Sequence, residues 1–143
     1  MVKGIVAPLA GALLLAAPPL AGVRAQDDRC TGGQTPGGVI IVLFDRGQAV
    51  LNAQAQRELA SVARRAIAQK ANRLCLDAFA DAFLGKERDH ALARARADAV
   101  AYELAAHGYP RENIVIHRIT DPKRVTGQKE TMTERKVEIR YGR

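Results

Sequence analysis

The sequence predicts a small α+β domain of two layers, in which two main helices cover one face of a mixed four-stranded sheet. Two segments, 52–70 and 86–106, carry apolar residues three and four positions apart, which is the spacing of an amphipathic helix. Short apolar or alternating segments typical of strands lie before, between and after them. The expected order is therefore β-α-β-α-β-β. Two successive strand-helix units place both helices on the same face of the sheet.

The first strand and the first helix follow from the first half of the chain. The strand is expected at 39–44, where consecutive apolar residues, VIIVLF, stand between Gly38 and Asp45. Such a continuous β-branched run is typical of a central strand that is covered on both faces. The helix is expected to begin after Asn52, a favourable N-cap residue. Its apolar face has members at helical spacing, which are Ala55, Leu59, Val62, Ala66 and Ile67.

The rest of the chain supplies a second helix and three more strands. The helix is expected at 86–106, where Gly108 and Pro110 stop it. A long polar and basic loop separates the last two strands, which are expected to form an antiparallel element. The first and the last of the three strands alternate in polarity, as half-buried strands do. The strands are expected at 73–79, 114–119 and 136–141.

The first 25 residues are expected to be a cleaved secretory signal and not part of the fold. Lys3 supplies a basic start, 5–17 is almost wholly apolar, and small residues precede Gln26. The apolar run is too short and too interrupted by proline to favour a spanning helix, although an uncleaved anchor remains the alternative. The expected organisation is a signal peptide at 1–25, a flexible N-terminal segment at 26–38 and a folded domain at 39–143.

Cys30 and Cys75 are the only cysteines of the chain. Disulfides form in the oxidising compartments that exported proteins enter. We therefore expect a disulfide between them that ties the N-terminal segment to the sheet. Two free thiols, or a bond to another chain, remain the alternative.

The charge and composition narrow the choice of partner. The chain has a formal net charge of +7, but only 4% of its residues are aromatic. Nucleic-acid binding is not expected, because the chain is exported and lacks the aromatic residues on which bases stack. Anionic polymers and surfaces of the cell wall are better partners for a basic exported domain.

No catalytic or metal-binding constellation stands out. His90, His107 and His117 lack the spacing of metal ligands, among themselves and with the cysteines, and are expected at the surface or at strand ends. Glu87 and Asp89 stand at a helix start, where acidic residues at the surface complement the helix dipole. We therefore expect no enzymatic activity, no cofactor and no metal.

Arg96 is the exception in the second helix. Counting in fours gives Leu92, Arg96, Val100 and Leu104, so a guanidinium stands in the middle of an apolar stripe. A permanently charged group is rarely placed there without a carboxylate partner. The turn between the second strand and this helix contains Asp81, which we expect to be that partner.

At these residues the chain resembles the OmpA-like peptidoglycan-binding domain family. The family has an Asp in a turn, an Arg fifteen residues later in a Leu-Ser-x-x-Arg-Ala motif, and a closing Asn-Arg-Arg-Val-Glu-Ile strand. In this sequence Asp81 precedes Arg96 by fifteen residues, LARARA at 92–97 occupies the helix motif, and ERKVEI at 134–139 is similar to the closing strand. The resemblance covers residues 39–141.

The resemblance implies a non-catalytic periplasmic domain, associated with the cell wall or the outer membrane, that binds peptidoglycan non-covalently. Asp81 would accept from the ammonium of the diaminopimelate in the stem peptide, and Arg96 would bind its carboxylate. Arg135 is a weaker candidate ligand. Asp89 occupies the position of a family Asn in the first turn of the helix. An envelope membrane protein is a further expected partner.

The turn around Asp81 departs from the family pattern. Gly-His-Thr-Asp is replaced by AFAD at 78–81, which removes the threonine hydroxyl, and Asp89 would repel the carboxylate of the ligand. The alternative is therefore a protein-interaction or scaffold module of an envelope complex that keeps the fold without binding peptidoglycan.

Overall fold

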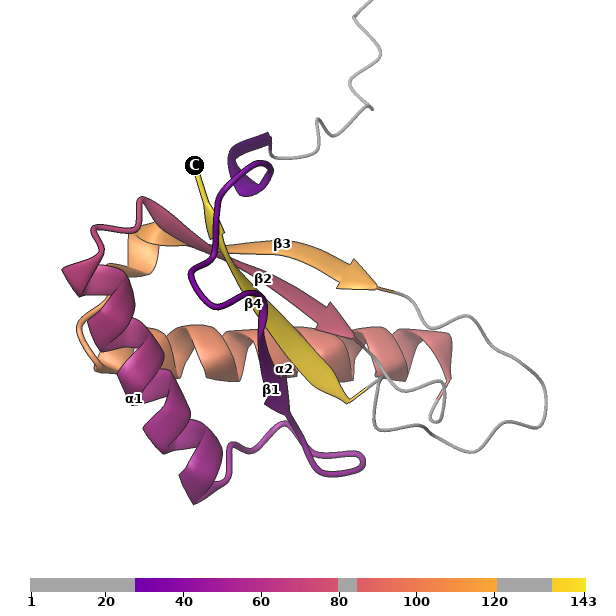
Figure 1. Ribbon diagram of the computed structural model, residues 1–143. Coiled ribbons are helices and arrows are strands. Elements are labelled where there is room, and N and C mark those ends of the chain that lie inside the picture. Colours follow the sequence, from indigo (N-terminus) through magenta and orange to yellow (C-terminus); the bar gives the residue numbers. More distant parts are fainter. Residues whose placement is uncertain (1–27, 80–84, 121–134) are drawn as a thin grey trace, which may run out of the picture.

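The computed structural model describes residues 28–79, 85–120 and 135–143 and shows a two-layer α+β domain (Figure 1). The predicted order of elements is confirmed. Two short 3-10 helices, Asp28–Cys30 and Arg111–Asn113, precede β1 and β3. The main elements are β1 (Ile40–Leu43), α1 (Ala53–Ala68), β2 (Arg73–Phe79), α2 (Lys86–Ala106), β3 (Ile114–Thr120) and β4 (Lys136–Gly142).

The sheet has the strand order β1-β4-β2-β3. β2 and β3 pair in parallel, as expected for strands joined by a helix, and β4 pairs antiparallel with both β1 and β2. β4 therefore runs antiparallel to β3, as predicted, but it does not pair with β3, because β2 lies between them. The last strand instead joins β1 to the rest of the sheet.

The core lies between one face of the sheet and both helices. Leu74, Leu76 and Ala78 of β2 and Val137 and Ile139 of β4 are fully buried on this face. The helices contribute Leu59, Val62, Val100 and Leu104 to the same apolar cluster. The α1 N-cap is confirmed, because Ala55 N donates to the Asn52 side chain at 2.8 Å. Ile67 was wrongly assigned to the apolar face of α1, since it is 47% exposed.

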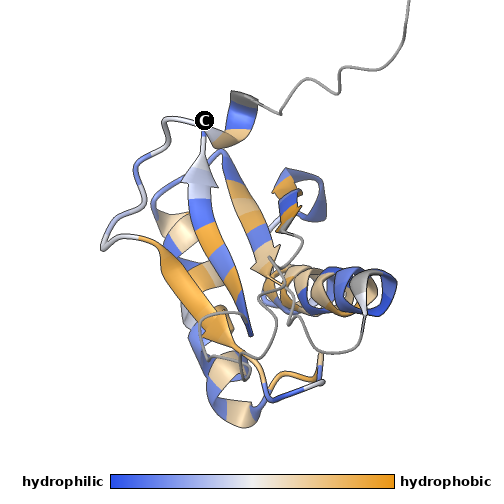
Figure 2. Ribbon diagram, turned by 90° about the vertical axis from the view of Figure 1, so that its right-hand side faces the viewer, coloured by the Kyte–Doolittle hydropathy of each residue, from blue (hydrophilic) through white to orange (hydrophobic). Residues whose placement is uncertain are grey.

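β1 lies at an edge of the sheet and not at its centre. Ile40 and Val42 turn toward the core, whereas Val39, Ile41 and Leu43 are between 46% and 50% exposed. The expectation of a strand covered on both faces was wrong. A continuous apolar run shows that both faces of a strand are apolar, and it does not show that both are covered. Figure 2 shows this strand as one orange arrow along its whole length.

The predicted disulfide between Cys30 and Cys75 is present, with the two Cα atoms 5.8 Å apart. It fixes the segment before β1 beside the end of β4, where Arg143 N donates to Arg29 O at 2.8 Å. Gly142 permits this close approach, since a Cβ there would lie 2.5 Å from Arg29 O and 2.9 Å from Cys75 Sγ. The expected signal peptide lies outside the described residues. Within the residues described, no helix combines the length and apolarity needed to cross a membrane.

Candidate functional site

Arg96 is fully buried on α2, as the sequence predicted, and it contacts the loop between β1 and α1. Its Nε donates to Gln48 O at 2.8 Å and its Nη2 donates to Asp45 O at 3.2 Å. The guanidinium also stands 5.4 Å from the ring centroid of Phe44. These contacts are charge-assisted hydrogen bonds to carbonyls and a cation-π contact, both of which gain strength away from water. Arg96 thereby holds the β1–α1 loop against α2.

The predicted partner of Arg96 is Asp81, and this residue lies outside the described residues. The pairing therefore stays a prediction.

Asp89 is fully buried on α2, seven residues before Arg96 and therefore on the same side of the helix. The interpretation of Asp89 as a surface charge was wrong, whereas Glu87 is exposed as expected. Asp89 N donates to Gly85 O at 2.8 Å in the first turn of α2. A carboxylate near a helix N-terminus interacts favourably with the helix dipole, which lowers the cost of burying it.

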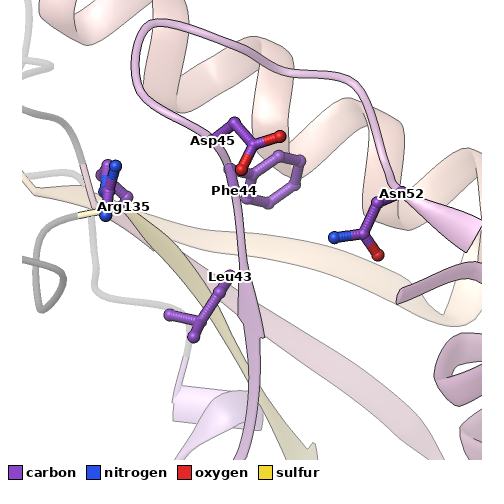
Figure 3. A pocket seen from close by; sticks show the side chains of 5 residues that line it. All are labelled: Leu43, Phe44, Asp45, Asn52 and Arg135. Carbon is purple, nitrogen blue, oxygen red and sulfur yellow. The ribbon is translucent and has the colours of Figure 1, made fainter. Parts of the chain in front are cut away.

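Arg135 lies beside a small cavity of about 100 Å³ that opens where β1 ends (Figure 3). Leu43, Phe44, Asp45 and Asn52 line the rest of it. Phe44 N donates to Arg135 O at 2.9 Å, so the main chains at the end of β1 and the start of β4 are joined here. Asp45 and Arg135 thus place an acid and a base on the same cavity, next to the loop that Arg96 holds.

Asp45 was not predicted as a site residue. Its position in the sequence could have indicated it, because it is the first polar residue after an apolar strand. Side chains at strand ends and in the following loops often take part in binding. Arg96 and Arg135 are far apart in the sequence, but both contact the segment that contains Phe44 and Asp45.

A second polar cluster lies on the sheet face away from the helices. His117 Nδ1 is 2.9 Å from Asp77 Oδ1, and Arg140 Nη2 donates to Asp77 Oδ2. Asp77 is 3% exposed, and the side chain of His117 is 7% exposed. The β2–β3 register shifts between Leu76 and Asp77, so the pairing passes from Ile116 to Arg118 and His117 lies at the irregularity. The expectation that His117 lies at the surface or at a strand end was therefore wrong.

Tyr109 and Tyr141 lie close together in the core. Burial, reinforced by the proximity of Tyr141, raises the pKa of Tyr109 to about 12. Burial also raises the pKa of Tyr141 above its usual value. The hydroxyl of Tyr109 donates to Ala71 O at 2.9 Å, which is a bond available only to the protonated phenol. This pair stabilises the fold and has no described contact with the Arg96 region.

Metal coordination has no candidate site in the described residues, because no group of three or more His, Cys, Asp or Glu side chains is suitably placed there.

Comparisons with solved structures show the same fold in envelope proteins. The OmpA-like domain of FopA1 from Francisella tularensis has a TM-score of 0.62 and 19% identity, covering 71% of this chain and 69% of that one. The peptidoglycan-associated lipoprotein from Burkholderia pseudomallei has a TM-score of 0.62 and 20% identity, covering 71% and 88%. The periplasmic domain of Helicobacter pylori MotB has a TM-score of 0.58 and 18% identity, covering 73% and 74%.

The family comparison reaches most of the folded part of the chain. No curated protein matches the sequence. The model of the OmpA family matches residues 43–138, which include Arg96 and Arg135 and run from the last residue of β1 into β4. Members of this family are non-catalytic structural proteins of the cell envelope. The chain belongs to the OmpA family.

Proposed function

We propose that this domain binds peptidoglycan non-covalently in the periplasm, through the diaminopimelate of the stem peptide. The observation that carries the proposal is the place of Arg96. This cation is fully buried at the position of the family Arg, and it contacts the loop whose Asp45 shares a cavity with Arg135. An acid and two bases therefore lie around one end of the domain.

The chemistry of the ligand matches such a site. The free end of diaminopimelate is an amino acid head group, with an ammonium and a carboxylate only a few bonds apart. In the proposed complex Asp81 accepts from the ammonium, and Arg96 donates to the carboxylate with Arg135 as a second donor. Each charge-assisted hydrogen bond contributes roughly 1.5–3 kcal/mol, so a single site binds weakly and reversibly. Many copies of the ligand along one wall polymer raise the overall avidity.

Asp89 adds negative charge to the same side of α2. In the proposed complex it lies near the ligand and opposes the carboxylate, whereas the family Asn is neutral. The site of this chain is therefore expected to bind more weakly than one with Asn at this position, and to depend more on the ammonium of the ligand.

The relatives support the cell-envelope setting of the proposal. One similar structure is named as a peptidoglycan-associated lipoprotein and another as a periplasmic domain. Export through the signal peptide expected at 1–25 would bring this domain to the same compartment, where its disulfide between Cys30 and Cys75 can form.

Co-sedimentation with insoluble peptidoglycan tests the proposal. The purified protein should pellet with diaminopimelate-containing peptidoglycan and much less with peptidoglycan that has lysine at the same position, because lysine lacks the carboxylate that the arginines bind. Arg135→Ala should reduce the pelleted fraction. Arg94→Ala is the matched control, since Arg94 is exposed on α2 and pairs only locally with Asp98.

A scaffold role without wall binding is the second candidate. The replacement of the family turn by AFAD at 78–81 favours it, because the threonine hydroxyl is lost. It predicts that the folded wild-type protein stays in the supernatant at low salt with both kinds of peptidoglycan. That result would contradict the proposed function.

A further inference from the structure

We propose that the free edge of β1 and the first turns of α1 form a groove that binds an extended segment of a partner protein as a fifth strand of the sheet. This groove adjoins the cavity of the proposed wall-binding site, with which it shares Leu43 and Asn52, but the proposal does not depend on wall binding. Four features of the described residues support the proposal: the direction of the β1 main chain, the exposed side chains of β1, the cavity beside α1, and the charge of that cavity.

The main chain of β1 presents hydrogen-bonding groups to its outer edge. Phe44 N donates to Arg135 O, and Val42 pairs with Val137, so the alternate residues 40, 42 and 44 direct their N–H and C=O groups toward β4. Ile41 and Leu43 must then direct theirs away from β4. Among the described strands, β1 pairs with β4 alone. The groups of Ile41 and Leu43 are therefore available to an added strand.

The side chains of the same two residues are apolar and half exposed. Ile41 is 49% and Leu43 is 50% exposed on the sheet face away from the helices. Proteins usually protect edge strands with charged residues, proline or bulges. β1 has the sequence IIVL, without charge or proline, and its register with β4 is regular. An exposed apolar edge of this kind is a template for strand addition.

α1 forms the second wall of the groove. A cavity of about 290 Å³ is lined by Ile41 and Leu43 on β1 and by Asn52, Gln54, Ala55 and Glu58 at the start of α1. The two sets of residues can share a cavity only around the free edge, because the opposite edge of β1 is occupied by β4. Figure 1 shows α1 beside β1 on the side away from β4. An edge strand flanked by a helix is a common arrangement for binding an extended peptide.

The helix wall favours a single strand over a second copy of this domain. In a second copy of the domain, α1 likewise lies beside the free edge of β1, and this is the edge that would have to pair. Two copies could approach edge to edge only if their helices met first. A partner segment that brings no helix of its own avoids this clash.

The charge of the cavity indicates the chemistry of the partner. Among the described residues that line it, Glu58 alone is charged, in a chain of net charge +7. Residues of an added strand that lie opposite Ile41 and Leu43 would place their side chains on the exposed sheet face. The intervening residues would point toward α1 and Glu58. The fitting segment therefore alternates apolar residues with lysine or arginine.

Fluorescence anisotropy with labelled hexapeptides tests the proposal. A peptide of alternating Val and Lys should bind the protein saturably, and about tenfold more tightly than a peptide of alternating Val and Glu, a difference of about 1.4 kcal/mol. N-methylation of the residues that face β1 should abolish binding, because it removes their N–H donors. Equal binding of the methylated peptide, or no saturable binding of the Val-Lys peptide, would overturn the proposal.

Two variants locate the site. Ile41→Lys should abolish binding, because it adds a cation at the edge, and Glu58→Gln should remove the preference for Lys over Glu peptides. Glu87→Gln is the control, since Glu87 is exposed on α2. Circular dichroism checks that each variant is folded, and peptidoglycan co-sedimentation should be unchanged in all three. If light scattering instead shows a dimer that Ile41→Lys dissociates, the occupant is a second copy and the proposal is wrong.

Discussion

Arg96 Nε donates to Gln48 O at 2.8 Å, and this bond joins the middle of α2 to the loop that leads into α1. A cation in an apolar helix face would by itself be costly, because burial removes its water. Here main-chain carbonyls replace part of that water, and the ring of Phe44 lies against the guanidinium. The same contacts fix the position of Asp45, which lines the cavity next to Arg135. One residue therefore supports the fold and shapes the proposed binding site.

Replacing Arg96 should destabilise the protein. Arg96→Ala removes the hydrogen bonds to two loop carbonyls and leaves a void under the loop. We expect the free energy of unfolding to fall by roughly 3–5 kcal/mol, because each hydrogen bond to a charged group contributes about 1.5–3 kcal/mol. Urea denaturation followed by circular dichroism measures the change.

Arg94→Ala provides the comparison for this measurement. Arg94 pairs with Asp98 on the exposed face of the same helix. Its loss should change the stability by less than about 0.5 kcal/mol. Similar effects for the two variants would show that the contacts of Arg96 with the loop contribute little.

Much of this fold could be predicted because the signals are local. The apolar spacing of α2, its stop before Gly108 and the N-cap Asn52 each depend on neighbouring residues, and the structure confirms them. The place of β4 between β1 and β2 depends on contacts between distant segments, for which the alternation of β4 carries no information. The exposure of β1 was missed for the same reason.

The candidate site was predictable to a similar extent. Burial of Arg96 followed from the helical spacing. Its hydrogen bonds to the carbonyls of Asp45 and Gln48 could not be predicted. Every residue type has a main-chain carbonyl, so the sequence does not indicate which carbonyls accept a bond. Asp77 and His117 likewise meet only because β2 and β3 are neighbours with a register shift at that point.

The disulfide should contribute strongly to stability. Cys30 and Cys75 are 45 residues apart, and closing a loop of this length restricts the unfolded chain by roughly 3–4 kcal/mol on the chain-entropy model. Cys30→Ser/Cys75→Ser should therefore unfold at a lower urea concentration than the oxidised wild type. Reduced wild type should behave like the double variant. If reduction leaves the midpoint unchanged, the bond does not stabilise the fold.

Asp77 should stabilise the protein through its contacts on the sheet face away from the helices. Asp77→Asn keeps the shape of the side chain but removes the charge that Arg140 and His117 share. We expect a loss of about 1–3 kcal/mol, because these two groups would keep only a weaker, neutral acceptor. Thermal or urea unfolding measures the loss. Glu112→Gln, at an exposed position, serves as the control and should be close to neutral.

Alkaline pH should destabilise the protein through Tyr109. Its pKa is raised from 10.0 to about 12 in the folded state, so the unfolded chain loses this proton first as the pH rises. Stability that is fully present below pH 10 should then decrease between about pH 10 and pH 12. Tyr109→Phe should be less stable at neutral pH, since it loses the bond to Ala71 O, but its stability should fall less steeply over that interval.

Urea titrations at a series of pH values measure both slopes. Tyr102→Phe is the matched control, because Tyr102 is 74% exposed on α2 and its variant should follow the wild-type profile. Tyr141, whose pKa burial also raises, should keep part of the alkaline decrease in the Tyr109→Phe protein. Parallel profiles for wild type and Tyr109→Phe would mean that this phenol ionises equally in the folded and unfolded chains, and that its burial does not oppose the charge.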